Sequence, residues 1–274
     1  MKYVASFLTK GGLLLPFLLF LFTLDLQAQG SRTASAASYC ERGVKRHERG
    51  ELDLAISDYN IAMEFDPNYA PAYYNRGVAY FDKGDLDVAI ADYSKAIELR
   101  PTLTGAWYNR GIAMKMKGDL DGAIADFSRA TELNPRLVGA YNNRGNARRA
   151  LGDLDGALTD YNTVIRLNGQ MACAWNNRGN VWRVKGELGK AVADYDRAIK
   201  LDPRYAVAYL NRGFALLLLG RRAEAERDFA RALQLDDKLE PTLEMQLRLV
   251  GSSAGEMESR REVLARGIRA RSGL

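Results

Sequence analysis

The stretch "AYNNRGNARRALGDLDGALTDY", residues 140–161, decides the fold, and its Asn-Arg-Gly triplet occupies residues 143–145. The intact triplet recurs, always at multiples of 34 residues, at residues 75–77, 109–111, 177–179 and 211–213. A sixth, altered copy at residues 41–43 keeps the arginine and the glycine and has glutamate in place of asparagine. A fixed period of this length without insertions predicts one small structural unit repeated six times.

Other positions of the repeat are as regular as the triplet. With Ala36 as position 1, position 8 is always glycine, position 20 is always alanine, and positions 4 and 24 are always aromatic. Position 32 is proline in four of the six units. Apolar residues recur at helical spacing over positions 1–14, and the glycine at position 15 is typical of a helix end. The "GDLD" segments that follow offer aspartate oxygens as helix caps, so each unit is predicted to contain two helices.

This combination of aromatic, glycine, alanine, aromatic and proline positions resembles the tetratricopeptide repeat (TPR) family, whose units have this length. The resemblance covers residues 36–239. It implies an all-α fold, a right-handed superhelical solenoid of six helix-turn-helix repeats whose first helices line a concave groove. The chain departs from the family pattern at position 7, where leucine is usual and arginine stands in every unit.

The segments that flank the repeats differ from them in composition. Residues 241–250, "PTLEMQLRLV", place leucines at helical spacing, which predicts a capping helix over residues 240–251 that covers the last repeat. Residues 252–274 form a charged tail, and residues 29–35 are expected to be a linker that precedes the repeats.

The first 28 residues are typical of an export signal. Lys2 and Lys10 both lie before an apolar stretch over residues 11–24, and Lys10 directly adjoins it. The small residue Ala28 provides a cleavage position. The stretch is shorter than the roughly 20 apolar residues that span a bilayer, and Pro16 interrupts it. We therefore expect a cleaved signal peptide over residues 1–28 and an exported protein of the bacterial periplasm. The alternative is an uncleaved N-terminal anchor in the inner membrane, which would be the only contact with the membrane.

Charge and cysteine content add two expectations. The formal net charge of +5 is dispersed over 274 residues, so it does not by itself indicate a nucleic-acid-binding protein. The two cysteines, Cys40 and Cys173, are four units apart. We expect two free thiols, because a disulfide needs Cα atoms within about 7 Å of each other.

Position 7 is arginine and position 23 is aspartate in all six units. In the TPR family position 7 faces the second helix of the unit, where a partly buried charge needs a partner. We therefore expect a structural ion pair in each repeat; the alternative is that both side chains are solvated. The expected pairs include Arg76 with Asp92, Arg110 with Asp126, Arg144 with Asp160, and Arg178 with Asp194.

The family resemblance also indicates a binding surface, because positions 2, 5, 6, 9, 12 and 13 line the groove in TPR proteins. Position 6 is asparagine in five units, and such amides can hydrogen-bond an extended peptide; the alternative is that they contact water or the neighbouring unit. The polar, positive part of the predicted peptide-binding surface comprises Lys115, Asn143, Asn146, Arg149, Asn177, Asn180 and Arg183. The aromatic and apolar part comprises Tyr74, Val78, Phe81, Tyr108 and Ile112, and unit six adds Leu210, Phe214 and Leu217.

No group of residues predicts catalysis. His47 is the only histidine, so "HERGE" at residues 47–51 lacks the second histidine of a zinc helix. The "GDLDG" runs at residues 118–122 and 152–156 lack the distal glutamate of a calcium loop. We expect no enzymatic activity, no metal, no cofactor and no small-molecule substrate. The expected function is a protein-interaction scaffold or adaptor of the cell envelope, binding a protein or peptide with acidic and hydrophobic residues. The alternative is a basic repeat module that binds nucleic acid or an anionic envelope polymer.

Overall fold

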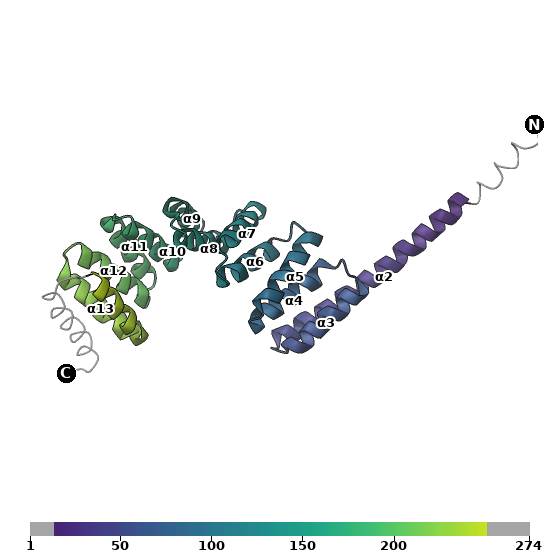
Figure 1. Cartoon of the computed structure of the whole chain (residues 1–274), viewed down its shortest axis with the longest axis horizontal. Coiled ribbons are helices and arrows are strands. Elements are labelled where there is room, and N and C mark those ends of the chain that lie inside the picture. The colour runs from purple at the N-terminus through teal and green to yellow at the C-terminus, as the bar shows by residue number, and fades with distance from the viewer. Residues whose placement is uncertain (1–13, 251–274) are drawn as a thin grey trace, which may run out of the picture. The chain divides into compact units, whose positions relative to one another are not determined.

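The computed structural model of the chain describes residues 14–250, and this range contains thirteen α-helices, one short 3₁₀ helix and no β-strand (Figure 1). The helices are α2 (Leu14–Glu48), α3 (Leu52–Phe65), α4 (Ala70–Lys83), α5 (Leu86–Leu99), α6 (Thr104–Met116), α7 (Leu120–Leu133), α8 (Val138–Ala150), α9 (Leu154–Leu167), α10 (Ala172–Val184), α11 (Leu188–Leu201), α12 (Ala206–Leu218), α13 (Arg222–Leu235), η1 (Asp237–Leu239) and α14 (Glu240–Val250). Each 34-residue unit therefore supplies one pair of helices, so the all-α repeat fold expected from the sequence is confirmed.

The chain divides into two compact units, with the boundary between Arg129 and Ala130 inside α7. In the first unit α2 packs on α3, α4 packs on α5, and α4 also lies against both neighbouring first helices, α2 and α6. In the second unit the pairs are α8 with α9, α10 with α11, and α12 with α13, and α10 lies against α8 and α12. Within each unit, the first helices of consecutive repeats are thus neighbours.

The glycine of each Asn-Arg-Gly triplet sets the distance between the two helices of a repeat. A Cβ placed on Gly179 would lie 2.7 Å from a ring carbon of Tyr195, and one on Gly111 would lie 2.8 Å from a ring carbon of Phe127. Both rings are fully buried. Only glycine leaves room for the aromatic ring of the second helix, which outweighs its cost of about 1 kcal/mol inside a helix.

The glycine at position 15 ends each first helix. Its φ is positive in all six repeats, between 77° and 88°, which is a left-handed conformation that glycine adopts without steric cost. The aspartate caps expected for the second helices are formed in part. Asp119 and Asp153 accept hydrogen bonds of 2.9 Å from the backbone N–H groups of Gly122 and Gly156, whereas the side chain of Asp85 makes no such bond.

The N-terminal part of the described chain is one continuous helix. Residues 29–35, expected to be a linker, are helical in α2 and lead directly into the first helix of repeat one. Between residues 14 and 250, no helix has both the length and the apolar character needed to span a bilayer. Residues 1–13 and 251–274 lie outside the described range, which therefore omits the start of the expected signal segment and the charged tail at 252–274.

The last helix, α14, packs over the end of repeat six. Leu243 and Leu247 of α14 are at most 4% exposed. They form one apolar cluster with Leu210 and Phe214 of α12 and with Phe229 of α13. A terminal repeat has no neighbour to bury its apolar face, so a cap of this kind is required for stability.

Candidate functional site

The arginine of the triplet pairs with the aspartate 16 residues later in every repeat. The Nη2···Oδ1 distances lie between 2.5 and 2.8 Å, and the Nε atom also donates to the carboxylate, so each pair is bidentate. All six aspartates are at most 5% exposed, which rules out the alternative that they are solvated surface charges. The pairs are Arg42–Asp58, Arg76–Asp92, Arg110–Asp126, Arg144–Asp160, Arg178–Asp194 and Arg212–Asp228.

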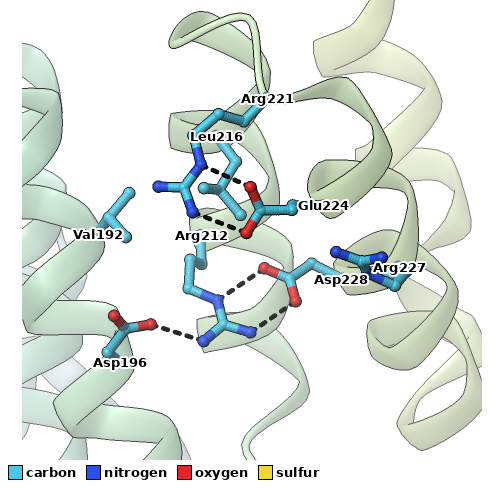
Figure 2. Close-up of a pocket in the computed structure, with 8 residues that line it drawn as sticks. All are labelled: Val192, Asp196, Arg212, Leu216, Arg221, Glu224, Arg227 and Asp228. Carbon is cyan, nitrogen blue, oxygen red and sulfur yellow. Dashed lines mark hydrogen bonds and ion pairs between the residues drawn. The ribbon is translucent and has the colours of Figure 1, made fainter.

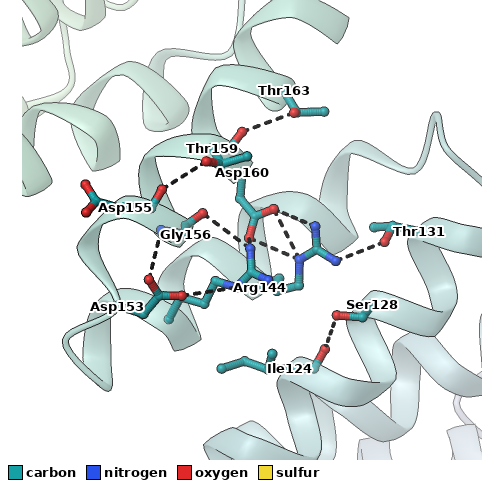
Figure 3. A network of polar contacts seen from close by, with 11 residues as sticks. Ile124, Ser128, Thr131, Arg144, Asp153, Asp155, Gly156, Thr159, Asp160 and Thr163 are labelled. Carbon is teal, nitrogen blue, oxygen red and sulfur yellow. Dashed lines mark hydrogen bonds and ion pairs between the residues drawn. The ribbon is translucent and has the colours of Figure 1, made fainter.

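The same arginines also connect each repeat to the one before it, which the sequence analysis did not predict. Nη1 of Arg178 donates to Asn162 at 2.7 Å. Nη1 of Arg144 donates to Thr131 at 3.2 Å, as Figure 3 shows. In Figure 2 the guanidinium of Arg212 lies between Asp228 of its own repeat and Asp196 of the preceding one. Each guanidinium also lies 4.6–5.9 Å from the centre of the aromatic ring at position 4. A planar cation that can stack and form several hydrogen bonds explains why arginine replaces the usual leucine.

Four of the five asparagines at position 6 hydrogen-bond the preceding repeat. Their Nδ2 atoms donate to the side chain 35 residues earlier, at position 5 of the preceding first helix. The bonds are Asn75 to Cys40 Sγ (3.3 Å), Asn109 to Tyr74 Oη (3.1 Å), Asn177 to Asn142 Oδ1 (3.2 Å) and Asn211 to Asn176 Oδ1 (2.9 Å). This is the alternative considered for the amide row. Oδ1 of Asn177 also accepts a bond of 3.4 Å from Nδ2 of Asn176. That Asn177 contacts a peptide stays a prediction.

Positions 9 and 24 form a second type of polar contact in repeats four and five. The hydroxyl of Tyr161 donates to Oδ1 of Asn146 at 2.7 Å, and that of Tyr195 donates to Oδ1 of Asn180 at 2.8 Å. Burial raises the pKa of Tyr161 to about 12, although the nearby charge of Arg149 acts in the opposite direction. Burial raises the pKa of Tyr195 to about 12 as well, against the charge of Arg183. Both phenols are therefore neutral donors at any physiological pH.

The sequence contained a signal for these tyrosine contacts that the motif analysis did not use. In repeats three and six position 9 is apolar, as Ile112 and Phe214, and position 24 is phenylalanine; in repeats four and five position 9 is asparagine and position 24 is tyrosine. Repeats one and two depart from this pattern, because valine at position 9 goes with tyrosine at position 24. In repeat one position 9 is Val44, and the hydroxyl of Tyr59 is buried without a hydrogen-bond partner. In four repeats, position 24 therefore carries a tyrosine hydroxyl only where position 9 supplies an asparagine oxygen to accept its hydrogen bond.

The two arginines at position 12 of repeats four and five carry unneutralised charge. Within residues 14–250, neither Arg149 nor Arg183 forms an ion pair with a carboxylate. Arg149 is exposed, whereas Nε of Arg183 is buried and has no hydrogen-bond partner. Asn143 is partly buried on the same helix as Arg149. Lys115, the remaining predicted cation, belongs to the first unit, where burial lowers its pKa.

An apolar pocket of about 200 Å³ lies in the first unit, among residues of the predicted aromatic and apolar surface. Phe81, Val78 and Ile112 line it, as expected for groove positions 9 and 12. Tyr74 and Tyr108 do not line it: their rings pack 6.0 Å from those of Tyr93 and Phe127, respectively. The other lining residues are Asp82, Tyr93 and Asn109, which the sequence analysis did not include.

The apolar groove expected in repeat six is filled. Leu210 and Phe214 are each 2% exposed because α14 packs in the same cluster, so they are not available to a ligand. A second pocket of about 260 Å³ adjoins Arg212 in the second unit (Figure 2). Its lining is mainly charged, and Arg221 pairs there with Glu224 at 2.7 Å. We assign this pocket to the row of arginine–aspartate ion pairs described above, which we call the arginine ladder.

The residues that the structure describes contain no cluster of His, Cys, Asp and Glu placed to hold a metal ion. Cys40 and Cys173 are free thiols. The fold and its contacts define a class, the all-α repeat proteins that present a surface of neighbouring helices.

The comparisons with known proteins identify the family. A family model described as TPR repeat matches residues 43–84, 79–118, 116–148, 145–182 and 183–220, and one described as tetratricopeptide repeat matches residues 206–239. The chain therefore belongs to the tetratricopeptide repeat family. Such repeats are protein–protein interaction modules and are generally not enzymes. No curated protein matches the chain.

Solved structures of TPR proteins resemble the chain over most of their own length. The MamA protein is 27% identical with a TM-score of 0.57, and the match covers 63% of this chain and 94% of that one. YrrB, described as "a TPR protein with an unusual peptide-binding site", is 22% identical with a TM-score of 0.59, covering 69% and 97%. The pilF protein of Pseudomonas aeruginosa is 18% identical with a TM-score of 0.66, covering 79% and 98%. The last two likenesses support the fold alone.

Proposed function

We propose that the chain is a non-enzymatic scaffold that binds a partner protein by holding a peptide segment against the first helices of its repeats. The observation that carries this proposal is the apolar pocket between α4 and α6, lined by Phe81, Val78 and Ile112 at groove positions. At about 200 Å³ it is smaller than the roughly 300–1,000 Å³ of pockets that hold drug-sized ligands. It therefore suits one apolar side chain of a peptide better than a small-molecule substrate.

The charge that we propose for the partner is inferred from the polar surface of the second unit. Arg149 and Arg183 have no carboxylate partner among the described residues, and Asn146 and Asn180 add amide groups beside them. This surface complements acidic side chains. Asn143 of α8 and Lys115 of the first unit are further proposed contacts. The partner segment is thus proposed to combine acidic with hydrophobic residues.

We also propose that binding takes place in the cell envelope. The support is the charged and then apolar composition of residues 1–28, which is typical of a secretory signal. A fusion of these residues to alkaline phosphatase, which is active only after export, tests the proposal. An inactive fusion would contradict it.

Selection from a random peptide library on the purified chain tests the binding function. We expect the selected peptides to contain an apolar residue near acidic residues. Phe81→Ala should weaken their binding at least about tenfold. This corresponds to the loss of about 1.4 kcal/mol or more, which is usual when an anchor side chain is removed. The matched control is Leu54→Ala on α3, which removes an apolar side chain that is 51% exposed outside the pocket.

Two results would contradict the proposal. One is equal binding by the Phe81→Ala and Leu54→Ala proteins when both show the helical content of the parent by circular dichroism. The other is binding whose affinity falls steeply with salt, as expected for a phosphate-rich polymer, because that dependence favours the nucleic-acid or anionic-polymer alternative.

A further inference from the structure

Repeats four and five share a set of three residues that no other repeat has: asparagine at position 9, arginine at position 12 and tyrosine at position 24. The sets are Asn146, Arg149 and Tyr161 in repeat four, and Asn180, Arg183 and Tyr195 in repeat five. Both have the same internal geometry, with the tyrosine hydroxyl 2.7 or 2.8 Å from the asparagine Oδ1. Two equivalent sites therefore lie one repeat apart in the second unit.

Each set presents hydrogen-bond donors. The tyrosine hydroxyl occupies Oδ1 of the asparagine, which leaves the Nδ2 group of the same amide to donate. The guanidinium beside it has donors only, and in the described part of the chain neither Arg149 nor Arg183 has a carboxylate partner. Nε of Arg183 is buried without any acceptor among the described residues, an arrangement that costs free energy.

The charges of both arginines act on the same tyrosine. Both Arg149 and Arg183 lower the pKa of Tyr195, acting against the effect of its burial. Their helices, α8 and α10, are packed neighbours. Two positive, donor-only sites on adjacent helices complement a ligand with two anionic acceptors.

The distance between α8 and α10 indicates how far apart the two anionic groups of the ligand should be. Packed helices lie about 8–10 Å apart. In a polyproline II segment, residues i and i+3 lie on the same side and about 9 Å apart. In a β-strand the nearest residues on one side, i and i+2, are only about 7 Å apart. A polyproline II segment therefore matches the two sites better than a strand.

We propose that Arg149 and Arg183 recognise an extended acidic peptide segment with two carboxylates three residues apart, of the form Glu-x-x-Glu. Each carboxylate is bound by one arginine together with the amide of Asn146 or Asn180. The inference rests on the proposed peptide-binding function and specifies the charge pattern of the partner.

The test uses the full chain and a series of proline-containing peptides of identical composition. Each peptide carries two glutamates, at separations of one, two, three, four or six residues, and its affinity is measured by isothermal titration calorimetry at constant salt. The three-residue separation should bind at least about tenfold more tightly than separations of one or six, because those peptides lose one of the two charged contacts.

Variants connect the spacing preference to the two arginines. The double variant R149Q/R183Q should bind all peptides equally and weakly, and R149K/R183K should retain part of the preference because it keeps both charges. The matched control is R166Q, which removes an exposed arginine from α9, outside the proposed site, and should retain the full preference. Thermal melts compare the folding of the variants with that of the parent.

Equal affinities for all separations in the parent would overturn this inference alone. A spacing preference that survives in folded R149Q/R183Q would also overturn it. If no peptide of the series binds and library selection yields none either, both this inference and the proposed function fail. If the spacing preference is present but Phe81→Ala has no effect on selected peptides, only the proposed role of the apolar pocket fails.

Discussion

Each residue of the recurring Asn-Arg-Gly triplet has its own structural role. In repeat five, Gly179 admits the ring of Tyr195, Arg178 binds Asp194 and the preceding repeat, and Asn177 donates to the preceding first helix. Two of the three residues therefore make a contact outside the repeat. A triplet that carries inter-repeat contacts must recur at a constant interval, because its partners do.

The buried ion pairs differ in how many cations surround the aspartate. Asp194 pairs with Arg178 alone among the described residues, whereas Asp160 pairs with both Arg144 and Arg148. Arg178→Leu should therefore lower the free energy of unfolding by about 3–5 kcal/mol, because it leaves a buried carboxylate unpaired. Arg144→Leu should cost less.

Urea denaturation of the two variants measures this difference. Lys185→Ala is the control, because it removes an exposed pair with Asp155 that should contribute about 1 kcal/mol or less. A loss that is larger for Arg144→Leu than for Arg178→Leu would contradict the role assigned to Arg148.

The buried tyrosines predict a loss of stability in alkali. Burial raises the pKa of both Tyr161 and Tyr195 to about 12, above the ordinary value of 10 that applies in the unfolded chain. The phenols ionise at a lower pH in the unfolded chain than in the folded one. The stabilisation of the folded state by these two tyrosines is therefore complete below pH 10 and is lost as the pH rises from about 10 to 12. The free energy of unfolding should fall less steeply across this range in Tyr161→Phe/Tyr195→Phe. Urea denaturation at a series of pH values measures the slope, and an unchanged slope would refute the assignment.

At the scale of the element, glycines with different surroundings have different functions. In repeat five, Gly179 lies against a buried ring, Gly186 ends α10 with a φ of 79°, and Gly189 of α11 has no atom within 4 Å of a Cβ placed on it. The same residue type therefore serves packing in one helix and chain reversal at the end of another. At the third position, we find no structural requirement for glycine.

Alanine substitutions distinguish these three glycines. Gly179→Ala should cost about 1–3 kcal/mol because the added methyl group overpacks the core. Gly186→Ala should cost about 1–2 kcal/mol because alanine is strained in the left-handed conformation. Gly189→Ala should increase stability by up to about 1 kcal/mol through helix propensity. Melting temperatures rank the variants, and a stabilised Gly179→Ala protein would show that the close helix contact is not required.

For the whole molecule, stability is expected to be a sum over repeats and their interfaces, as in other repeat proteins. Within each unit the contacts run from each repeat to the next, through the arginine and asparagine ladders and the apolar clusters. The end of the array is closed by α14, so weakening this helix should affect neighbouring repeats most.

The variant Leu243→Ala/Leu247→Ala tests how far the effect of the cap extends. It creates cavities in the cluster that contains Phe214 and Phe229, so amide hydrogen exchange should become faster in α12 and α13. Exchange in α4 and α5 of the first unit should stay unchanged. Met245→Ala, at a position that is 57% exposed, is the control. Faster exchange throughout the chain would show a single cooperative fold instead.

The sequence by itself determined the number of repeats, the helix pairs, the turn glycines, the capping helix and the partner of each position-7 arginine. These features follow from local periodicity, or from residues that co-occur within one 34-residue unit. The tertiary structure alone decided which side chains remain available on the surface. Asn177 is used by the preceding helix, Leu210 and Phe214 are covered by α14, and Arg149 and Arg183 have no carboxylate partner among the described residues. The physical reason is that hydrogen bonding and burial at these positions depend on atoms of other repeats, whose direction and distance are set only when the helices pack.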